Sequence, residues 1–296
     1  MTRWITAYIV LAAVAVAAPP PEVPPQARFL ANGKVKIGVD LSSGGAICWF
    51  SELPAERNLM NHADRGRFMQ QSYYGKTDGS KWVAKPWRWN PVQGGDYKGK
   101  PAKLLDVKES DGTLYVSSVP VNWAGGQDLD ECRMEEWITL ADQVARIRFR
   151  FSYHGQDTHP ATHQELPAVF VDHALTDLVY YQGPAPWTGQ PSQQDRPGWP
   201  NESRSPSENW AGFVGPDGRG VGVLFPGTER ITTYRFAGPD GPTGGGCSYF
   251  APIRTMAITP GLVFEYNVYL TIGTAAEMRA RFKPLAVPPS AKPAGR

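Results

Sequence analysis

The chain has 296 residues, of which 41% are hydrophobic and 20% are charged, and its formal net charge is +2. Basic and acidic residues are mixed along the sequence, so there is no basic stripe of the kind that nucleic acid or an anionic membrane would bind. We therefore expect neither partner. The length fits a single large β domain, because all-β units of roughly 200 to 250 residues are common.

The amino-terminal segment indicates a signal peptide. Arg3 precedes an apolar run from Ile5 to Ala18, which ends in small residues before three prolines. This run is shorter than the ~20 residues that a membrane-spanning helix needs. We predict a signal peptide at residues 1–18, a proline-rich spacer at 19–28 and an exported protein, periplasmic or extracellular, without membrane contact after cleavage.

Apolar residues alternate with polar ones in three segments, which predicts strands with one solvated face. These segments are Val35 to Leu41, Ile147 to Tyr153 and Leu262 to Ile272. Most turn signals between segments have hairpin length, which favours antiparallel pairing. Weaker patterns predict further strands at Ala46 to Ser51, Phe68 to Tyr74, Lys103 to Glu109, Thr113 to Val119, Trp137 to Leu140, Val169 to Val171, Leu178 to Tyr181, Trp210 to Val214, Gly220 to Phe225, Ile231 to Phe236 and Ser248 to Ile258.

One helix is predicted near the carboxyl end. Thr274 and Glu277 form a T-x-x-E capping box, and we expect Pro284 to stop the helix. Strands with one apolar face must bury it against a second sheet. We therefore predict an all-β fold, an antiparallel β-sandwich over residues 29–282 with one short C-terminal helix, and a disordered tail at 283–296.

The cysteines and the missing motifs exclude several classes of protein. Cys48, Cys132 and Cys247 allow at most one disulfide, and their spacing is not that of a zinc site. The sequence has no GxSxG, GxxxxGK[ST] or HExxH motif. We expect no cofactor and no metal.

Two long loops, from Gly75 to Gly99 and from Gly183 to Asn209, are rich in tryptophan, proline, glycine and amide residues. Structureless loops of this length are usually functional. Aromatic faces stack on sugar rings, while amide and hydroxyl groups bind sugar hydroxyls. The two loops therefore indicate a carbohydrate ligand.

A polar cluster from Asn58 to Tyr74 supplies the first candidate substrate contacts. Gln71 and Tyr73 share one face of the predicted strand with Gly75, which would place polar groups along a groove. The alternative is a polar turn that feeds a strand with ion-paired arginines. The candidates are Asn61, His62, Arg65, Arg67, Gln71 and Tyr73.

Further candidate contacts lie within the first loop and at the end of the second. Trp87 and Trp89 precede an NPxQGGD turn that contains Gln93 and Asp96, although two such tryptophans can also be ordinary core residues. Glu208 and Trp210 end the second loop at the start of a strand, where the alternative for Glu208 is a structural ion pair.

Glu165 and His163 are the candidate catalytic pair. Two residues apart on an extended segment, they would share a face and could serve as general acid and base on a sugar oxygen. The alternative is a surface histidine beside a structural carboxylate. Pro160 and Pro167 indicate a loop here, which argues against a metal site formed by His159 and His163.

Several strings resemble a group of secreted bacterial proteins from polysaccharide-degrading organisms, among them NLMNHADRGRFMQQSYYG, WNPVQGGD, HQELPAVFVD, YYQGPAPWTG, ENWAGFV and FEYNVYLTIGT. The resemblance runs from about Asn32 to Phe282. An early strand with SGGAICWF is also similar to the galactose-mutarotase-like supersandwich. These resemblances imply a supersandwich-like fold and a sugar-directed role. They assign no catalytic residue, because the histidines and late glutamate of the mutarotases have no matching motif here.

The sequence thus predicts a secreted carbohydrate-active enzyme, first of all a glycoside hydrolase that acts on an extracellular poly- or oligosaccharide. The alternatives are a polysaccharide lyase, a noncatalytic glycan-binding domain and an aldose epimerase. We expect the Asn61 to Tyr74, Trp87 to Asp96 and His163 to Glu165 segments to meet at one cleft. The sequence assigns no oligomeric state.

Overall fold

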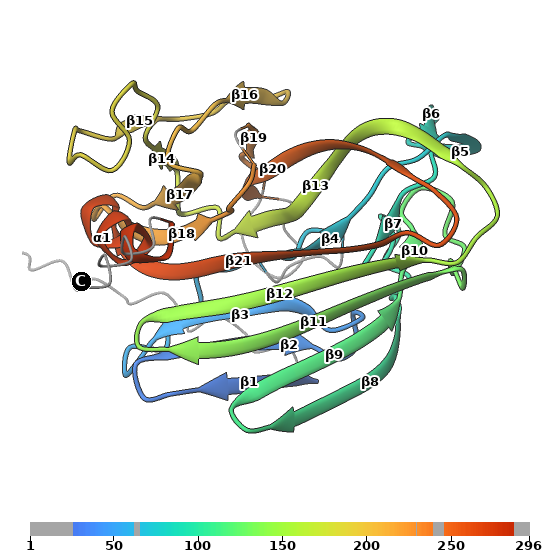
Figure 1. Ribbon diagram of the computed structural model, residues 1–296, viewed down its shortest axis with the longest axis horizontal. Helices are drawn as coiled ribbons and strands as arrows, with labels where there is room; N and C mark the ends of the chain where they lie inside the picture. The colour runs from blue at the N-terminus through green and yellow to red at the C-terminus, as the bar shows by residue number, and fades with distance from the viewer. Residues whose placement is uncertain (1–25, 62–65, 229, 239–245, 287–296) are drawn as a thin grey trace, which may run out of the picture.

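The computed structural model is built of antiparallel strands and one helix (Figure 1). It describes residues 26–61, 66–228, 230–238 and 246–286. The strands form sheets of nine, seven and three strands and a separate two-stranded hairpin. The predicted all-β fold class with a C-terminal helix is confirmed.

The nine-stranded sheet contains the strands with the clearest apolar alternation. Its spatial order is β15 (Gln193–Asp195), β14 (Asp177–Tyr180), β17 (Trp210–Val214), β18 (Arg219–Leu224), β21 (Val263–Thr274), β12 (Val144–Tyr153), β11 (Cys132–Ala141), β9 (Thr113–Val119) and β8 (Lys103–Ser110). On β12, Ile147, Phe149 and Phe151 are fully buried. On its other face Arg148 lies 3.9 Å from the centre of the Trp137 ring. The predicted one-sided burial of this strand is confirmed.

The seven-stranded sheet contains three of the segments in which candidate site residues were predicted. Its order is β10 (Val121–Asn122), β7 (Pro91–Val92), β4 (Gln70–Ser72), β13 (His159–Val171), β20 (Cys247–Ile258), β19 (Ile231–Phe236) and β16 (Glu202–Arg204). The three-stranded sheet joins β1 (Ala27–Ala31), β2 (Val35–Asp40) and β3 (Ala46–Glu52).

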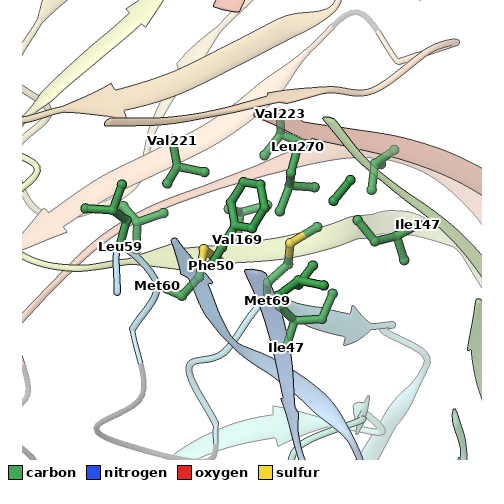
Figure 2. Close-up of a cluster of buried hydrophobic side chains, with 14 of the residues drawn as sticks. Ile47, Phe50, Leu59, Met60, Met69, Ile147, Val169, Val221, Val223 and Leu270 are labelled. Atoms are coloured by element: carbon green, nitrogen blue, oxygen red, sulfur yellow. The ribbon is translucent and has the colours of Figure 1, made fainter. Parts of the chain in front are cut away.

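The sheets bury one shared core. Figure 2 shows Ile147 of β12, Val223 of β18 and Leu270 of β21 near Val169 of β13, with Phe50 of β3 in the same cluster. All five side chains are fully buried. Burial of such a side chain contributes about 1.5–3 kcal/mol relative to exposure, so this cluster joins the three sheets into one body.

The helix α1 (Ala275–Ala286) begins at the predicted capping box. The Thr274 N–H donates to Glu277 Oε2 at 2.8 Å, and the Glu277 N–H donates to Thr274 Oγ1 at 3.3 Å. Pro284 does not stop the helix, which runs to Ala286. The proline removes one helical hydrogen bond, but only in the last turn. The tail predicted from residue 283 therefore begins four residues too early, and residues 287–296 lie outside the described part.

The predicted loop from Gly75 to Gly99 is wrong, because it contains a hairpin of β5 (Thr77–Trp82) and β6 (Lys85–Arg88), as well as β7. The hairpin turns at Val83 and Ala84, whose φ angles are 47° and 65°. Such two-residue turns usually contain asparagine or glycine, so Val83 and Ala84 carry no turn signal. In Figure 1 the hairpin lies at the opposite end of the molecule from α1.

The predicted loop around Pro160 is also wrong, since β13 runs from His159 to Val171. The strand tolerates both prolines because its register with β20 shifts between His159 and Thr162 and again between Glu165 and Val169. Proline has no N–H to donate and is accepted in strands at such irregularities.

The three cysteines are buried and form no disulfide with one another. Among the described residues, no helix is long and apolar enough to cross a membrane, and no cluster of three or more histidine, cysteine or acidic side chains could hold a metal ion.

Candidate functional site

A cavity of about 410 Å³ lies against the seven-stranded sheet and receives side chains from all three segments predicted to converge. We call it the aromatic cavity. It is lined by Gly66, Arg67, Gln70, Ser72, Tyr74, Trp82, Lys85, Trp87, Asn90, Val92, Trp123, Glu165, Ala168, Phe170, Trp199, Pro200, Asn201, Tyr234 and Tyr249.

A bulge in β13 positions Glu165 at this cavity. Glu165, Ala168 and Phe170 all line it, although side chains on a regular strand share a face only at even spacings. The register with β4 shifts between Glu165 and Ala168, and Pro167 lies within this interval. The extra residue returns the strand to the same face, so a carboxylate and apolar groups point into one cavity.

Two tyrosine hydroxyls hold the Glu165 carboxylate. Tyr249 Oη donates to Glu165 Oε1 at 2.6 Å, and Tyr74 Oη donates to the same oxygen at 2.9 Å. Burial raises the pKa of Glu165 above its ordinary value, while hydrogen bonds from Tyr249, Tyr74 and Ser72 oppose that rise. Burial raises the pKa of both tyrosines well above 10, so they remain protonated donors. A carboxyl group with a raised pKa in a cavity is suited to accept and return a proton.

Tyr249→Phe is expected to move the pH dependence of activity. The variant loses a hydrogen bond that favours the ionised carboxylate, so the pKa of Glu165 rises further. In a plot of kcat/KM against pH, the limb that follows the ionisation of Glu165 should shift to higher pH. The matched control is Tyr115→Phe, which removes a tyrosine–glutamate hydrogen bond to Glu135, away from the cavity. An unshifted profile for Tyr249→Phe would show that Glu165 does not control this limb.

Aromatic rings form two walls of the cavity. In the first, the hairpin wall, the rings of Trp82, Trp87 and Trp123 lie 5.2–5.4 Å apart. The second, the tyrosine wall, consists of Phe170, Trp199, Tyr234 and Tyr249, in which adjacent ring centres are 4.6–4.9 Å apart. Trp199 is 57% exposed, so its ring is available for stacking. Such faces suit the CH surfaces of sugar rings.

A second cavity of about 450 Å³ adjoins the first, and we call it the basic cavity. Both cavities are lined by Tyr74, Trp87, Glu165 and Asn201. The remaining lining of the basic cavity is largely polar and comprises Arg88, Thr162, His163, Ser203, Arg230, Thr232 and Ile253. Glu165 thus faces both spaces.

Four of the predicted site residues line these cavities. Arg67, Trp87 and Glu165 line the aromatic cavity, and His163 lines the basic cavity with Glu165. His163 is exposed and, two positions from Glu165, lies on the same face of β13. The predicted convergence of three segments thus agrees with the geometry, while the catalytic roles remain predictions.

In the first cluster, the strand face predicted to line the groove is wrong, because the opposite face lines the cavity. Gln71 and Tyr73 are fully buried on the core side, where Gln71 Nε2 donates to the Glu135 carbonyl at 3.1 Å and Tyr73 stacks on Phe151. The alternate residues Gln70, Ser72 and Tyr74 line the cavity instead. A shift of one position exchanges the two faces of a strand.

Three predicted contacts of the second loop are structural. Trp89 is buried and stacks on the His159 ring at 4.0 Å. Gln93 is fully buried, and its Nε2 donates to Glu136 Oε2 at 3.1 Å. Asp96 Oδ1 accepts the N–H groups of the turn at residues 98 and 100, at 2.9 and 2.7 Å. None of the three lines either cavity, because their side chains point into the core or hold a turn.

Glu208 and Trp210 lie elsewhere and support α1. Both are fully buried. Glu208 accepts from Trp210 Nε1 and from Arg279 Nε, each at 2.8 Å, and also from the Trp187 N–H. The alternative reading of Glu208 as an ion-pair partner is therefore the one that the structure supports.

The other candidates of the first cluster do not add described contacts to the cavity. Asn61 is buried, and its Nδ2 donates to the Arg67 carbonyl at 2.7 Å, so it holds the backbone near Arg67. His62 and Arg65 lie outside the described residues.

Sequence reasoning missed several lining residues. Trp82 and Trp199 lie in the two aromatic segments that were predicted as loops, so composition indicated the right segments. Tyr234 and Tyr249 lie within predicted strands, where no pattern separates a tyrosine that lines a cavity from a core tyrosine such as Tyr73.

Comparison with known proteins identifies the fold. Neither a family model nor a curated protein matches the sequence. Similar solved structures include a candidate aldose 1-epimerase from Escherichia coli, at 11% identity and a TM-score of 0.54, which covers 84% of this chain and 99% of that chain. A galactose mutarotase related enzyme from Lactobacillus acidophilus has 9% identity and a TM-score of 0.53, covering 84% and 97%. A galactose mutarotase-like protein from Lactobacillus casei has 11% identity and a TM-score of 0.51, covering 83% and 100%.

These likenesses show that the chain has a galactose-mutarotase-like β-sandwich fold. The similarity predicted from the SGGAICWF segment is thereby confirmed. Membership in a secreted bacterial group remains a prediction.

Proposed function

We propose that this protein is a carbohydrate-active enzyme in which Glu165 transfers a proton to or from a bound saccharide. The observation that carries the proposal is the position of Glu165, which lies between two tyrosine hydroxyls in the wall of a cavity lined by aromatic rings. The rings offer stacking faces for sugar, and Asn90 and Asn201 offer amide groups for its hydroxyls. Export to the periplasm or the exterior, as the amino-terminal segment predicts, is part of this proposal.

The chemistry favours a reaction that needs one carboxylate. Of the described residues that line the two cavities, Glu165 alone is acidic. The usual glycoside hydrolase uses a pair of carboxylates that flank the scissile bond. Epimerisation at an anomeric carbon needs only one base and one acid, which Glu165 and His163 can supply from one face of β13. We therefore place an aldose-epimerase type of reaction ahead of the predicted glycoside hydrolase.

A polysaccharide lyase is the second candidate, because basic side chains line the same cavities and could hold a uronate carboxylate. The raised pKa values of Tyr74 and Tyr249 argue against a tyrosinate base, which leaves Glu165 or His163 for proton abstraction.

Incubation of the protein with a panel of free aldoses, oligosaccharides and polysaccharides tests the proposal. Epimerisation changes the anomer or epimer without a change of mass, elimination gives unsaturated ends that absorb in the near ultraviolet, and hydrolysis gives new reducing ends. Saturable binding of a glycan without any product at high protein concentration would identify a noncatalytic binding domain and refute the enzyme proposal.

A further inference from the structure

Charged side chains are unevenly distributed around the two cavities. Arg67 and Lys85 line the aromatic cavity, and Arg88 and Arg230 line the basic cavity. Against these four basic residues stands Glu165, the single acidic residue among the described lining residues. The chain as a whole is nearly neutral, at +2, so this excess is local to the site.

Two of the arginines are held by neutral partners. Arg88 Nη1 donates to Thr162 Oγ1 at 3.4 Å, and Arg230 Nη2 donates to Ser203 Oγ at 3.0 Å. Neither arginine, nor Lys85, forms an ion pair with a described residue. Their positive charge is therefore not neutralised within the described part of the chain.

Arginines that line neither cavity differ in this respect. Arg204 pairs with both Asp195 and Glu202. Arg219 pairs with both Glu52 and Glu277, at 2.7 and 3.0 Å. The comparison shows that acidic partners are available to other arginines of the fold, whereas Arg88 and Arg230 have none among the described residues.

Such an arrangement favours an anionic ligand. A concave site lined by one sign of charge concentrates the electrostatic field, which attracts ligands of the opposite charge. A guanidinium group donates two parallel hydrogen bonds to a carboxylate or to a similar oxyanion. Arg88 lies on β6 and Arg230 directly precedes β19, so two separate segments could reach one anionic group.

The size of the site favours more than one sugar unit. The cavities measure about 410 and 450 Å³, and each falls within the roughly 300–1,000 Å³ of pockets that bind small ligands. The two cavities share Glu165 and three other lining residues. A saccharide chain could therefore extend from one cavity into the other past the Glu165 carboxylate.

We propose that the substrate is an acidic oligosaccharide, with one unit in the aromatic cavity and a neighbouring unit, which carries a carboxylate or sulfate group, beside Arg88 and Arg230. This inference rests on the proposed function and specifies its substrate class. The unit in the aromatic cavity is the reducing end, so that Glu165, which lines both cavities, transfers the proton at its free anomeric hydroxyl.

Calorimetric binding of matched oligosaccharides tests the inference. The probes are uronate trisaccharides from pectin, alginate and glucuronan, each paired with its carboxyl-reduced neutral counterpart, and sulfated galactan fragments, each paired with its desulfated form. At least one acidic probe should bind ~10-fold or more tightly than its neutral counterpart at low salt. The advantage should shrink as ionic strength rises from about 0.01 to 1 M, where the Debye length falls from ~30 to ~3 Å. The two sets of probes distinguish carboxylate from sulfate.

The double variant Arg88→Gln, Arg230→Gln should lose ~10-fold or more in affinity for the acidic probe and less than about 2-fold for its neutral counterpart, because charge-assisted hydrogen bonds form only with the anionic group. Arg146→Gln is the matched control, since Arg146 also donates to a neutral partner, Asn267, but lies outside both cavities. Neutral probes that bind as tightly as acidic ones would overturn the acidic substrate and leave the proposed function standing. Absence of binding to every saccharide would overturn both.

Discussion

Glu165→Gln is expected to lower turnover by ~10²-fold or more, the usual scale for loss of a general acid or base. Glutamine keeps the shape of the side chain and an oxygen that can accept from Tyr74 and Tyr249, so the fold and the affinity for saccharide should change little. The measurement is kcat on the saccharide that the substrate panel identifies, together with thermal unfolding and calorimetric binding.

Glu265→Gln provides the control for this substitution. Glu265 pairs with Arg148 and Arg150 on the exposed face of the nine-stranded sheet and lines neither cavity. Its replacement should leave turnover unchanged. If Glu165→Gln lowers stability but retains full activity per folded molecule, Glu165 is a structural carboxylate and the proposed chemistry fails.

Glu136→Gln should remove a large pH dependence of stability. Glu136 is fully buried in the core, where Gln93 Nε2 donates to Oε2 at 3.1 Å and Oε1 has no hydrogen-bond partner among the described residues. Burial raises its pKa from 4.5 to about 8. Because the folded pKa is the higher one, the stabilisation is fully present below pH 4.5 and is lost as pH rises to about 8.

The expected size follows from ~1.4 kcal/mol for each pH unit between the two pKa values, or roughly 5 kcal/mol in total. The free energy of unfolding, measured in urea from pH 5 to 9, should fall for the wild type relative to Glu136→Gln by an amount of this order. Glu135→Gln is the control. Glu135 is the neighbouring residue on the opposite face, where it pairs with Arg150 at 3.6 Å, so its effect should stay within ~1 kcal/mol across the range. Parallel curves for the wild type and Glu136→Gln would refute the raised pKa of Glu136.

Apolar alternation predicted most of the sheet architecture. The alternation over Ile147 to Tyr153 lies within β12, and the weaker patterns over Thr113–Val119, Trp210–Val214 and Ile231–Phe236 match the bounds of β9, β17 and β19. Alternation succeeds where one face is buried and the other solvated, since each residue then reports its own environment. It could not predict the hairpin of β5 and β6, most of whose residues are exposed and whose turn contains Val83 and Ala84.

The site was predicted by segment more reliably than by residue. In β4 both faces are buried, one against the core and one at the cavity, so Gln70 and Gln71 look alike in sequence. Only the pairing partner of the strand decides which face meets the cavity. The bulge after Glu165 is a further example, because it brings Ala168 and Phe170 onto the cavity side against simple alternation.

The strand order also determines how much of the chain must be synthesised before the two large sheets can form. β20 lies between β13 and β19, and β21 lies between β12 and β18, so the last two strands occupy interior positions in both large sheets. Until residues 247–274 have been synthesised, β12, β13, β18 and β19 each lack a neighbour, and the two halves of each sheet remain apart. Unpaired edges of this kind can recruit other chains, and pairing across long sequence separations is slow. A nascent chain that stops before Cys247 therefore lacks the centre of two sheets at once and has no smaller sandwich to fold into.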